Sequence, residues 1–223
     1  MHSMSRTLTF APIITLLFSL SGCSSSSTTN AGTSGTCNAP AACGGALDGT
    51  WAVDSVCVEG NLTAAMNKQL GLPSTCDTTF QSVSVGLSGT VTFANNTETD
   101  NLTQTMDAHI VYTAACESAV AGQPVTLTAS ICTTIQQQLM GTSGAFTTAA
   151  CSLSNGSCDC TASKSEAAPT VPQPYTVSGH TITYTGTDPS DPIDYCVSGT
   201  TLTGRQTYSG LAGIWTVTTL RKQ

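Results

Sequence analysis

Residues 193–206 read IDYCVSGTTLTGRQ, two strand-like runs on either side of Ser198-Gly199. Tyr, Ile, Val and Thr favour strands and a Ser-Gly pair favours a tight turn, so this stretch predicts a β-hairpin. The same alternation of strand-like runs and turns continues before this hairpin, with turns at Ser178-Gly179 and over 187–192. The strand-like runs are 174–178, 181–186, 193–198, 200–206 and 212–221. Short strands at this spacing favour an antiparallel barrel or sandwich.

Two short helices are expected upstream of these strands. A first strand is predicted over 48–57, and its alternation places every second residue on one face. The residues of that face are Trp51, Val53, Ser55 and Cys57. The helix 62–70 follows, and Asn61 is suited to cap it. A second helix is predicted over 130–140, because apolar residues recur there every four positions.

The region between the two helices is predicted to be β structure. A hairpin is expected from the runs 79–86 and 89–94, which turn at Leu87-Ser88-Gly89. Residues 95–100 are polar and predict a turn. Residues 102–114 (LTQTMDAHIVYTA) predict one long strand.

The chain contains eleven cysteines, and those beyond Cys23 are even in number. An even set in an exported chain predicts disulfide bonds. One candidate pair is Cys57–Cys76, which brackets the first helix. A second is Cys116–Cys132, which flanks the loop before the second helix. Further candidate pairs are Cys151–Cys160 and Cys37–Cys43.

The register of one predicted hairpin bears on these pairs. Asn155-Gly156 is a strong signal for a two-residue turn. Counting outward from it, Cys151 faces Cys160 at a non-hydrogen-bonded position, where side chains approach most closely. A shifted register would pair Cys151 with Cys158 instead, and both alternatives remain open.

The N-terminal part of the chain predicts export. Residues 1–22 contain an apolar run over 8–20, which is shorter than the roughly 20 residues that span a bilayer. The run ends in Leu20-Ser21-Gly22-Cys23, which resembles the lipobox of bacterial lipoproteins. The resemblance implies a signal peptide that is cut before Cys23 and a lipid on this cysteine. Ser24, in place of an aspartate, implies the outer membrane as the destination.

The residues after the lipidated cysteine divide into a tether and a domain. Residues 23–36 are rich in Ser, Thr and Gly and predict a flexible segment that lifts the rest off the membrane. Residues 37–223 then remain for one folded β domain, which suits their number.

The composition argues against nucleic-acid binding. Six lysines and arginines stand against thirteen aspartates and glutamates, a formal net charge of −7. Binding to phosphate backbones needs clustered basic side chains, and this sequence has no such cluster. Charged residues make up only 9% of the chain, and the abundant Thr favours half-buried strands.

The first and last predicted strands carry a family resemblance. Gly49-Thr50-Trp51 opens the first strand, a helix and a run of hairpins follow, and the last strand ends with Arg221. This order resembles the lipocalin-like domains of bacterial lipoproteins, over roughly residues 48–221. The resemblance implies an antiparallel lipocalin-like β-barrel, with the two short helices and the disulfides added to it. Such a barrel could hold one small apolar ligand.

The resemblance also implies roles for particular residues. Trp51 and Arg221 would be structural, with the arginine stacked on the indole ring at the barrel floor and Arg205 as second choice. Side chains of several strands would line the ligand, although core packing is the simpler role for each. These side chains are Val53, Val83, Val85, Phe93, Ile110 and Tyr112.

No catalytic motif accompanies these features. His109 lies in an alternating strand and His180 in a turn, and neither belongs to a nucleophile elbow or a zinc-protease helix. Asp188, Asp191 and Asp194 offer oxygen ligands for calcium, but they lie in a proline-rigid turn without the EF-hand glycine and glutamate. We therefore expect no enzyme activity, no cofactor and no metal.

Two functions remain as expectations from the sequence. The first is an envelope lipoprotein that binds a small apolar ligand, held at the membrane by its lipid anchor. The alternative is a structural or protein-interaction module whose barrel interior is filled by side chains. A cavity of ~300 Å³ or more would favour the first.

Overall fold

The computed structural model of the chain describes residues 37–69, 73–76, 79–141, 146–167, 170–185, 191–208 and 210–223. The predicted signal peptide, Cys23 and the tether lie outside these ranges. Antiparallel strands dominate the described part, accompanied by short helices and disulfides. The prediction of a mainly β, antiparallel and disulfide-rich fold is therefore confirmed.

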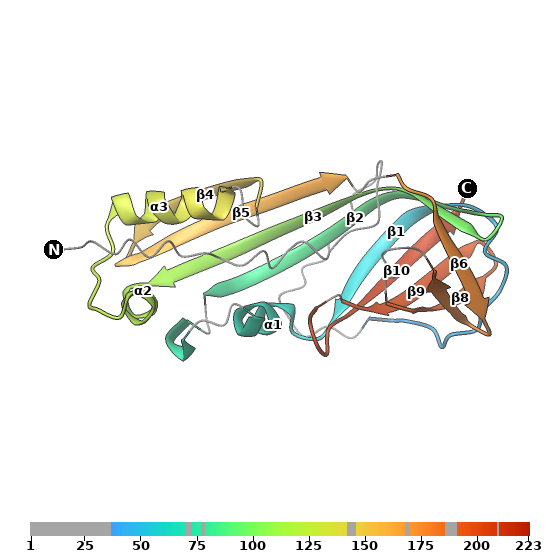
Figure 1. Cartoon of the computed structure of the whole chain (residues 1–223), viewed down its shortest axis with the longest axis horizontal. Helices are drawn as coiled ribbons and strands as arrows, with labels where there is room; N and C mark the ends of the chain where they lie inside the picture. Colours follow the sequence, from blue (N-terminus) through green and yellow to red (C-terminus); the bar gives the residue numbers. More distant parts are fainter. Residues whose placement is uncertain are drawn as a thin grey trace.

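The strands carry the labels of Figure 1. They are β1 (Gly49–Glu59), β2 (Phe80–Ala94), β3 (Thr97–Thr113), β4 (Thr148–Ser154), β5 (Ser157–Ala167), β6 (Gln173–Ser178), β7 (Thr181–Tyr184), β8 (Ile193–Ser198), β9 (Thr201–Thr207) and β10 (Trp215–Lys222). The helices are α1 (Leu62–Gln69), α2 (Ala114–Ala121) and α3 (Ala129–Met140), with a 3₁₀ turn η1 (Ser74–Cys76).

Helices α1 and α3 fall on the two predicted helices, whereas α2 was not predicted. The helix α2 begins where β3 ends, because Thr113 Oγ1 accepts a hydrogen bond from the Cys116 N–H. It ends at Gly122, whose φ of 70° is the left-handed conformation that glycine adopts readily. The local cap therefore overrides the continuation of the predicted strand to residue 114.

Eight strands of the described part form a closed ring, in the order β1, β2, β3, β6, β7, β8, β9, β10. We call this part the ring; it occupies the right half of Figure 1. Its closure is uneven. Strands β2 and β3 pair along their whole length, but β3 meets β6 only through Thr97–Pro174 and Glu98–Gln173.

The strands β2 and β3 continue beyond the ring. From Thr103 onward β3 pairs with β5, and β5 pairs with β4. We call the extension the part formed by residues 80–86 of β2, residues 103–113 of β3, strands β4 and β5, and helices α1–α3. Figure 1 shows it as the left half of an elongated molecule. The β2–β3 hairpin thus joins the two halves.

Each half has its own hydrophobic cluster among the described residues. In the ring it comprises Leu47, Trp51, Val53, Val56, Leu87, Val91, Phe93, Leu102, Tyr175, Ile182, Tyr184, Tyr195, Leu202 and Leu220. In the extension, side chains of β2, β3 and β5 pack against those of the helices, as Val83, Ile110 and Ile135 do. Burying apolar side chains of this size stabilises each half by about 1.5–3 kcal/mol per residue before entropy is counted.

The predicted turn at Leu87-Ser88-Gly89 is wrong. Strand β2 runs through it without interruption, and Gly89 pairs with Leu102 of β3. The chain turns instead at Asn95-Asn96, with φ of 53° and 57°. Two successive residues with positive φ give the tight hairpin whose twist matches long paired strands. Strand β3 consequently begins at Thr97, inside the stretch predicted as a polar turn.

A bulge in β1 changes the predicted faces of that strand. The register with β10 shifts between Val53 and Ser55, so Asp54 is an extra residue. Trp51 and Val53 point into the ring, but beyond the bulge the buried residues are Val56 and Val58. Cys57 therefore lies on the opposite face from the one predicted.

The disulfide pairs differ from most of those expected. Within the described residues they are Cys37–Cys57, Cys43–Cys196, Cys76–Cys116, Cys132–Cys158 and Cys151–Cys160. Cys151–Cys160 forms in the register set by the Asn155-Gly156 turn, where the two residues face each other. The candidate pairs Cys57–Cys76, Cys116–Cys132 and Cys37–Cys43 do not form.

Long-range packing explains these three differences. The bulge turns Cys57 away from the first helix and toward Cys37 of the N-terminal segment. That segment runs beside β8, where Gly44 bridges Cys196, so Cys43 bonds to Cys196. Helix α2 brings Cys116 to Cys76 of η1, so Cys132 of α3 bonds to Cys158 of β5 instead. None of these contacts is local in the sequence.

Candidate functional site

The structure separates the residues expected to line a ligand. Val53 and Phe93 belong to the cluster of the ring. The other four belong to the cluster of the extension, under the helices; they are Val83, Val85, Ile110 and Tyr112. The six therefore do not surround one interior, because β2 and β3 pass from one half of the molecule to the other.

The cation beside Trp51 is Lys222 rather than Arg221. Trp51 is fully buried, its indole N–H donates to the Leu47 carbonyl at 2.7 Å, and Lys222 Nζ lies 5.2 Å from the centre of its rings. Trp51 and Lys222 are cross-strand partners, so alternation turns Arg221 outward to Asp54. Arg205, the second choice, stacks on Trp215 at 4.2 Å.

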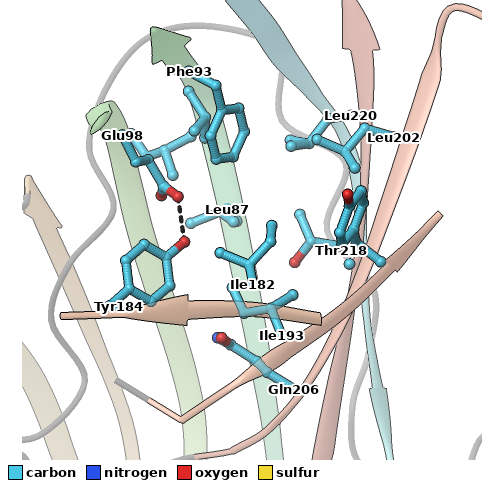
Figure 2. Close-up of a pocket in the computed structure, with 14 residues that line it drawn as sticks. Leu87, Phe93, Glu98, Ile182, Tyr184, Ile193, Leu202, Gln206, Thr218 and Leu220 are labelled. Atoms are coloured by element: carbon cyan, nitrogen blue, oxygen red, sulfur yellow. Dashed lines mark hydrogen bonds between the residues drawn. The ribbon is translucent and has the colours of Figure 1, made fainter. Parts of the chain in front are cut away.

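The ring contains a partly open cavity of about 60 Å³. Its walls are mainly aliphatic and aromatic and come from β2, β3 and β7–β10. The lining residues are Leu87, Val91, Phe93, Glu98, Leu102, Ile182, Tyr184, Ile193, Tyr195, Leu202, Gly204, Gln206, Thr218 and Leu220. Figure 2 shows Glu98 reaching in from β3 with its carboxylate toward Tyr184.

One of two neighbouring buried carboxyl groups lines this cavity: Glu98 does, and Asp100 is not among the lining residues. Glu98 and Asp100 are two residues apart on β3, so both side chains point into the ring, and each is at most 4% exposed. The Tyr184 hydroxyl donates to Glu98 Oε2, and the Glu98 and Asp100 side chains share a hydrogen bond. Asp100 Oδ1 has no hydrogen-bond partner.

The ionisation of this carboxyl pair is strongly perturbed. Burial, followed by the charge of Glu98, raises the pKa of Asp100 to about 9. Burial also raises the pKa of Glu98, although the Tyr184 hydroxyl opposes this shift. Two carboxylates this close in a dry interior cannot both ionise easily, so the pair holds a proton at neutral pH.

No basic side chain of the described residues forms an ion pair with Glu98 or Asp100. The ion pairs of the described residues join His109 to Asp159, Lys164 to Glu166, Arg205 to Glu59 and Arg221 to Asp54. All four lie outside the ring interior, on partly exposed side chains. A buried carboxyl group that lacks both a cation and a full set of hydrogen bonds is costly, and it marks a candidate site of function.

The remaining polar candidates lack a comparable arrangement. His109 Nε2 lies 3.0 Å from Asp159 Oδ1 on a side-chain pair that is about 40% exposed. Asp191 and Asp194 accept hydrogen bonds from Thr207 and Thr181, and Asp188 lies outside the described residues. In the part of the chain that the structure describes, no three His, Cys, Asp or Glu side chains are grouped as metal ligands.

Sequence reasoning missed Glu98 and Asp100 because they were placed in a polar turn. The signal was nevertheless present. Leu102, Met106 and Ile110 are buried on one face of β3, and the same period of two extends back through Asp100 to Glu98. Acidic residues in phase with a buried face are the pattern that would have found them.

No protein-family model matches this chain, and no curated protein is similar to it in sequence. Among the described residues, the helices are too short or too polar to cross a bilayer.

Proposed function

We propose that this protein is a lipid-anchored lipoprotein of the bacterial cell envelope, whose ring binds a small ligand in the cavity beside Glu98 and Asp100. The observation that carries the proposal is the buried Glu98 carboxyl group, which lines a largely apolar cavity and shares a hydrogen bond with Asp100, whose Oδ1 has no partner. Folding gains nothing from burying this group, so its presence is best explained by a partner that enters from outside. The protein binds this ligand without transforming it.

The anchor part of the proposal rests on the sequence. The apolar run 8–20 precedes Leu20-Ser21-Gly22-Cys23, and the Ser/Thr/Gly segment to residue 36 separates this cysteine from the folded part. The disulfides support an oxidising compartment, since such bonds persist mainly outside the cytosol. The outer membrane is the proposed location.

The lipocalin-like part of the proposal is supported by the ring and by Trp51. The tryptophan of the first strand lies inside a ring of strands, with a basic residue of the last strand over it. The volume of the cavity limits the size of the ligand, however. About 60 Å³ is well below the ~300 Å³ of an ordinary small-molecule pocket, so the ligand is compact.

The small cavity also favours a second candidate function. A ring filled by its own side chains would serve as a structural or protein-interaction module at the membrane surface. The two functions differ in what the ring interior holds, because the module needs no ligand there.

The anchor is tested by expression of the full chain in a bacterial host with radiolabelled palmitate. We expect label on the wild type, sedimentation with the membranes, and loss of both in Cys23→Ala. Equal release of the wild type and the variant into the soluble fraction would overturn the anchor.

The binding function is tested by native mass spectrometry of the full chain released from those membranes. We expect a bound mass of roughly 100 Da or less, in line with the size of the cavity, that disappears on denaturation. A clean unliganded mass, unchanged after incubation with envelope extract, would instead support the filled module.

A further inference from the structure

We propose that the ligand of the ring is a compact primary ammonium ion, whose charged group binds the Glu98–Asp100 pair from the cavity that Glu98 lines and whose short alkyl body fills that cavity. This inference rests on the proposed ligand-binding function and names the chemical class of the ligand.

The donor requirement of the site points to ammonium. The groups that lack donors are acceptors: the buried Asp100 Oδ1 has no hydrogen-bond partner, and Glu98, which lines the cavity, has hydrogen bonds only to Tyr184 and Asp100 among the described residues. A primary ammonium has three N–H donors and one positive charge. It can therefore donate to Glu98 in the cavity wall and supply a positive charge beside the carboxyl pair, whereas a neutral alcohol supplies one donor and no charge.

The walls of the cavity favour an organic cation over a metal ion. Phe93, Tyr184 and Tyr195 line the cavity together with aliphatic side chains. Aromatic faces attract organic cations, and the aliphatic walls match a short alkyl chain. Calcium and magnesium need six or more oxygen ligands, but the pair and Tyr184 offer few.

The volume limits the size of the ion. A water molecule needs about 10–15 Å³ of such space, so about 60 Å³ accommodates about four to six non-hydrogen atoms. An amine with a four-carbon chain has this size. Figure 2 shows Glu98 and Tyr184 on one side of the cavity, opposite Leu202 and Leu220. The ammonium group of the ligand would lie beside Glu98 and Tyr184, and its alkyl end beside Leu202 and Leu220.

The binding is coupled to proton release. The empty pair holds a proton at neutral pH, and the arriving ammonium replaces it, so each ligand bound releases a proton. The other titratable groups around the pair are Tyr175 of β6, Tyr184 of β7, Tyr195 of β8 and Asp48 before β1, with Lys222 over Trp51 on β10. The tyrosines stay neutral in this range because burial raises their pKa values.

Affinity for the amine should therefore increase with pH as the pair becomes easier to deprotonate. The increase should continue up to about pH 9, the pKa of Asp100. Above about pH 10 the affinity should fall, because an alkylamine loses its own proton near the pKa of lysine.

The test compares n-butylamine with n-butanol, which has the same number of non-hydrogen atoms and no charge. Titrations of the full chain in detergent at pH 8 are followed by isothermal calorimetry. We expect the amine to bind at least tenfold more tightly than the alcohol, and more tightly at pH 8 than at pH 6. Tetramethylammonium, which carries charge without N–H donors, should bind at least tenfold more weakly than the amine.

Variants distinguish the effect of the carboxyl pair on binding from the effect of the overall negative charge of the protein. Asp100→Asn and Glu98→Gln should each lose at least tenfold in affinity for the amine and keep their affinity for the alcohol. Glu166→Gln removes an acidic charge from the extension, and it should change neither the affinity for the amine nor the affinity for the alcohol. Retention of amine binding by both Asp100→Asn and Glu98→Gln would overturn the proposed contact.

The outcomes also distinguish this inference from the function beneath it. Equal affinity for the amine and the alcohol would overturn the ammonium ligand and leave a small-ligand site in place. Binding of neither compound would overturn both. Binding of Ca²⁺ in place of the amine, lost in Asp100→Asn, would overturn the ammonium ligand in favour of a metal ion.

Discussion

Among the described residues, the extension buries neutral polar side chains, whereas the ring buries two carboxyl groups. In the extension, the Asn67 side chain donates to the Phe80 carbonyl at 3.0 Å and accepts from the Phe80 N–H at 2.8 Å. In the ring, Glu98 and Asp100 are equally buried, yet one Asp100 oxygen has no partner. The first arrangement fastens a helix to a strand, whereas the second leaves hydrogen-bonding capacity unused.

The two halves also differ in how they are closed. Disulfides within the extension join positions 9, 26 and 40 residues apart. In the ring, Cys37–Cys57 spans 20 residues but Cys43–Cys196 spans 153, and the β3–β6 contact has two residue pairs. The extension is thus stabilised by disulfides of short sequence separation and by packing. The ring has one disulfide of long sequence separation and a buried carboxyl pair with perturbed pKa values. We infer that the ring, rather than the extension, carries the binding function.

The largest expected effect concerns the two kinds of disulfide. The double variant Cys43→Ala/Cys196→Ala should lower the free energy of unfolding by about 4–5 kcal/mol, because its bond closes the longest loop. The double variant Cys151→Ala/Cys160→Ala should lose about 2–3 kcal/mol. Urea denaturation under oxidising conditions measures both. Equal losses of unfolding free energy in the two variants would contradict the larger stabilisation expected from the Cys43–Cys196 bond.

Next in size is the role of Asn67 in the extension. Asn67→Ala leaves the Phe80 N–H and carbonyl without their partners and should cost about 2–3 kcal/mol by urea denaturation. Thr63→Val on the same helix is the matched control. It removes a buried hydroxyl that has no partner, so its cost should be close to zero. A loss in Thr63→Val as large as in Asn67→Ala would contradict this account of buried polar groups.

A third effect is the pH dependence of stability. The unfolded Asp100 is ionised above pH 4, whereas the folded one keeps its proton until about pH 9. The folded state therefore binds more protons, and its stability falls as pH rises through this window. The fall should approach about 1.4 kcal/mol per pH unit.

The measurement is urea denaturation at pH 6, 7 and 8. Asp100→Asn should flatten the dependence, while Asp107→Asn, an exposed position of the same strand in the extension, should leave it intact. A stability that is independent of pH in the wild type would contradict the protonated pair.

The smallest expected effect concerns the two basic residues at the end of β10. Lys222→Ala should cost about 0.5–1 kcal/mol, since Lys222 lies over the Trp51 ring. Arg221→Ala should cost less than about 0.5 kcal/mol, because its pair with Asp54 is largely exposed. Thermal denaturation of the two variants checks the order, and a larger loss in Arg221→Ala would reverse it.

The local elements of the fold were predictable from the sequence. Asn155-Gly156 set a hairpin register and with it the Cys151–Cys160 pair, and the strands 174–178 and 193–198 follow from alternation and Gly turns. Long-range features were not predictable. The bulge at Asp54 reversed the face of Cys57, and the path of β2 and β3 through both halves divided Val53 from Val83.

The candidate site was only partly within reach of sequence reasoning. Phe93 was predicted to line a ligand and does line the cavity. Glu98 and Asp100 were missed, because acidic residues after Asn95-Asn96 favour a turn unless a long partner strand holds them in register. The pairing of β2 with β3 supplies that register, and its local sign is the period of two that runs from Leu102 back through Asp100 to Glu98.

The most direct test of the account is urea denaturation of the wild type and Asp100→Asn at pH 8, with and without n-butylamine. We predict that the variant is at least as stable as the wild type without amine. Amine at ten times its dissociation constant should stabilise the wild type by about 1.4 kcal/mol and leave the variant unchanged. A variant that is less stable than the wild type and gains as much from the amine would show that Asp100 serves the fold rather than a ligand.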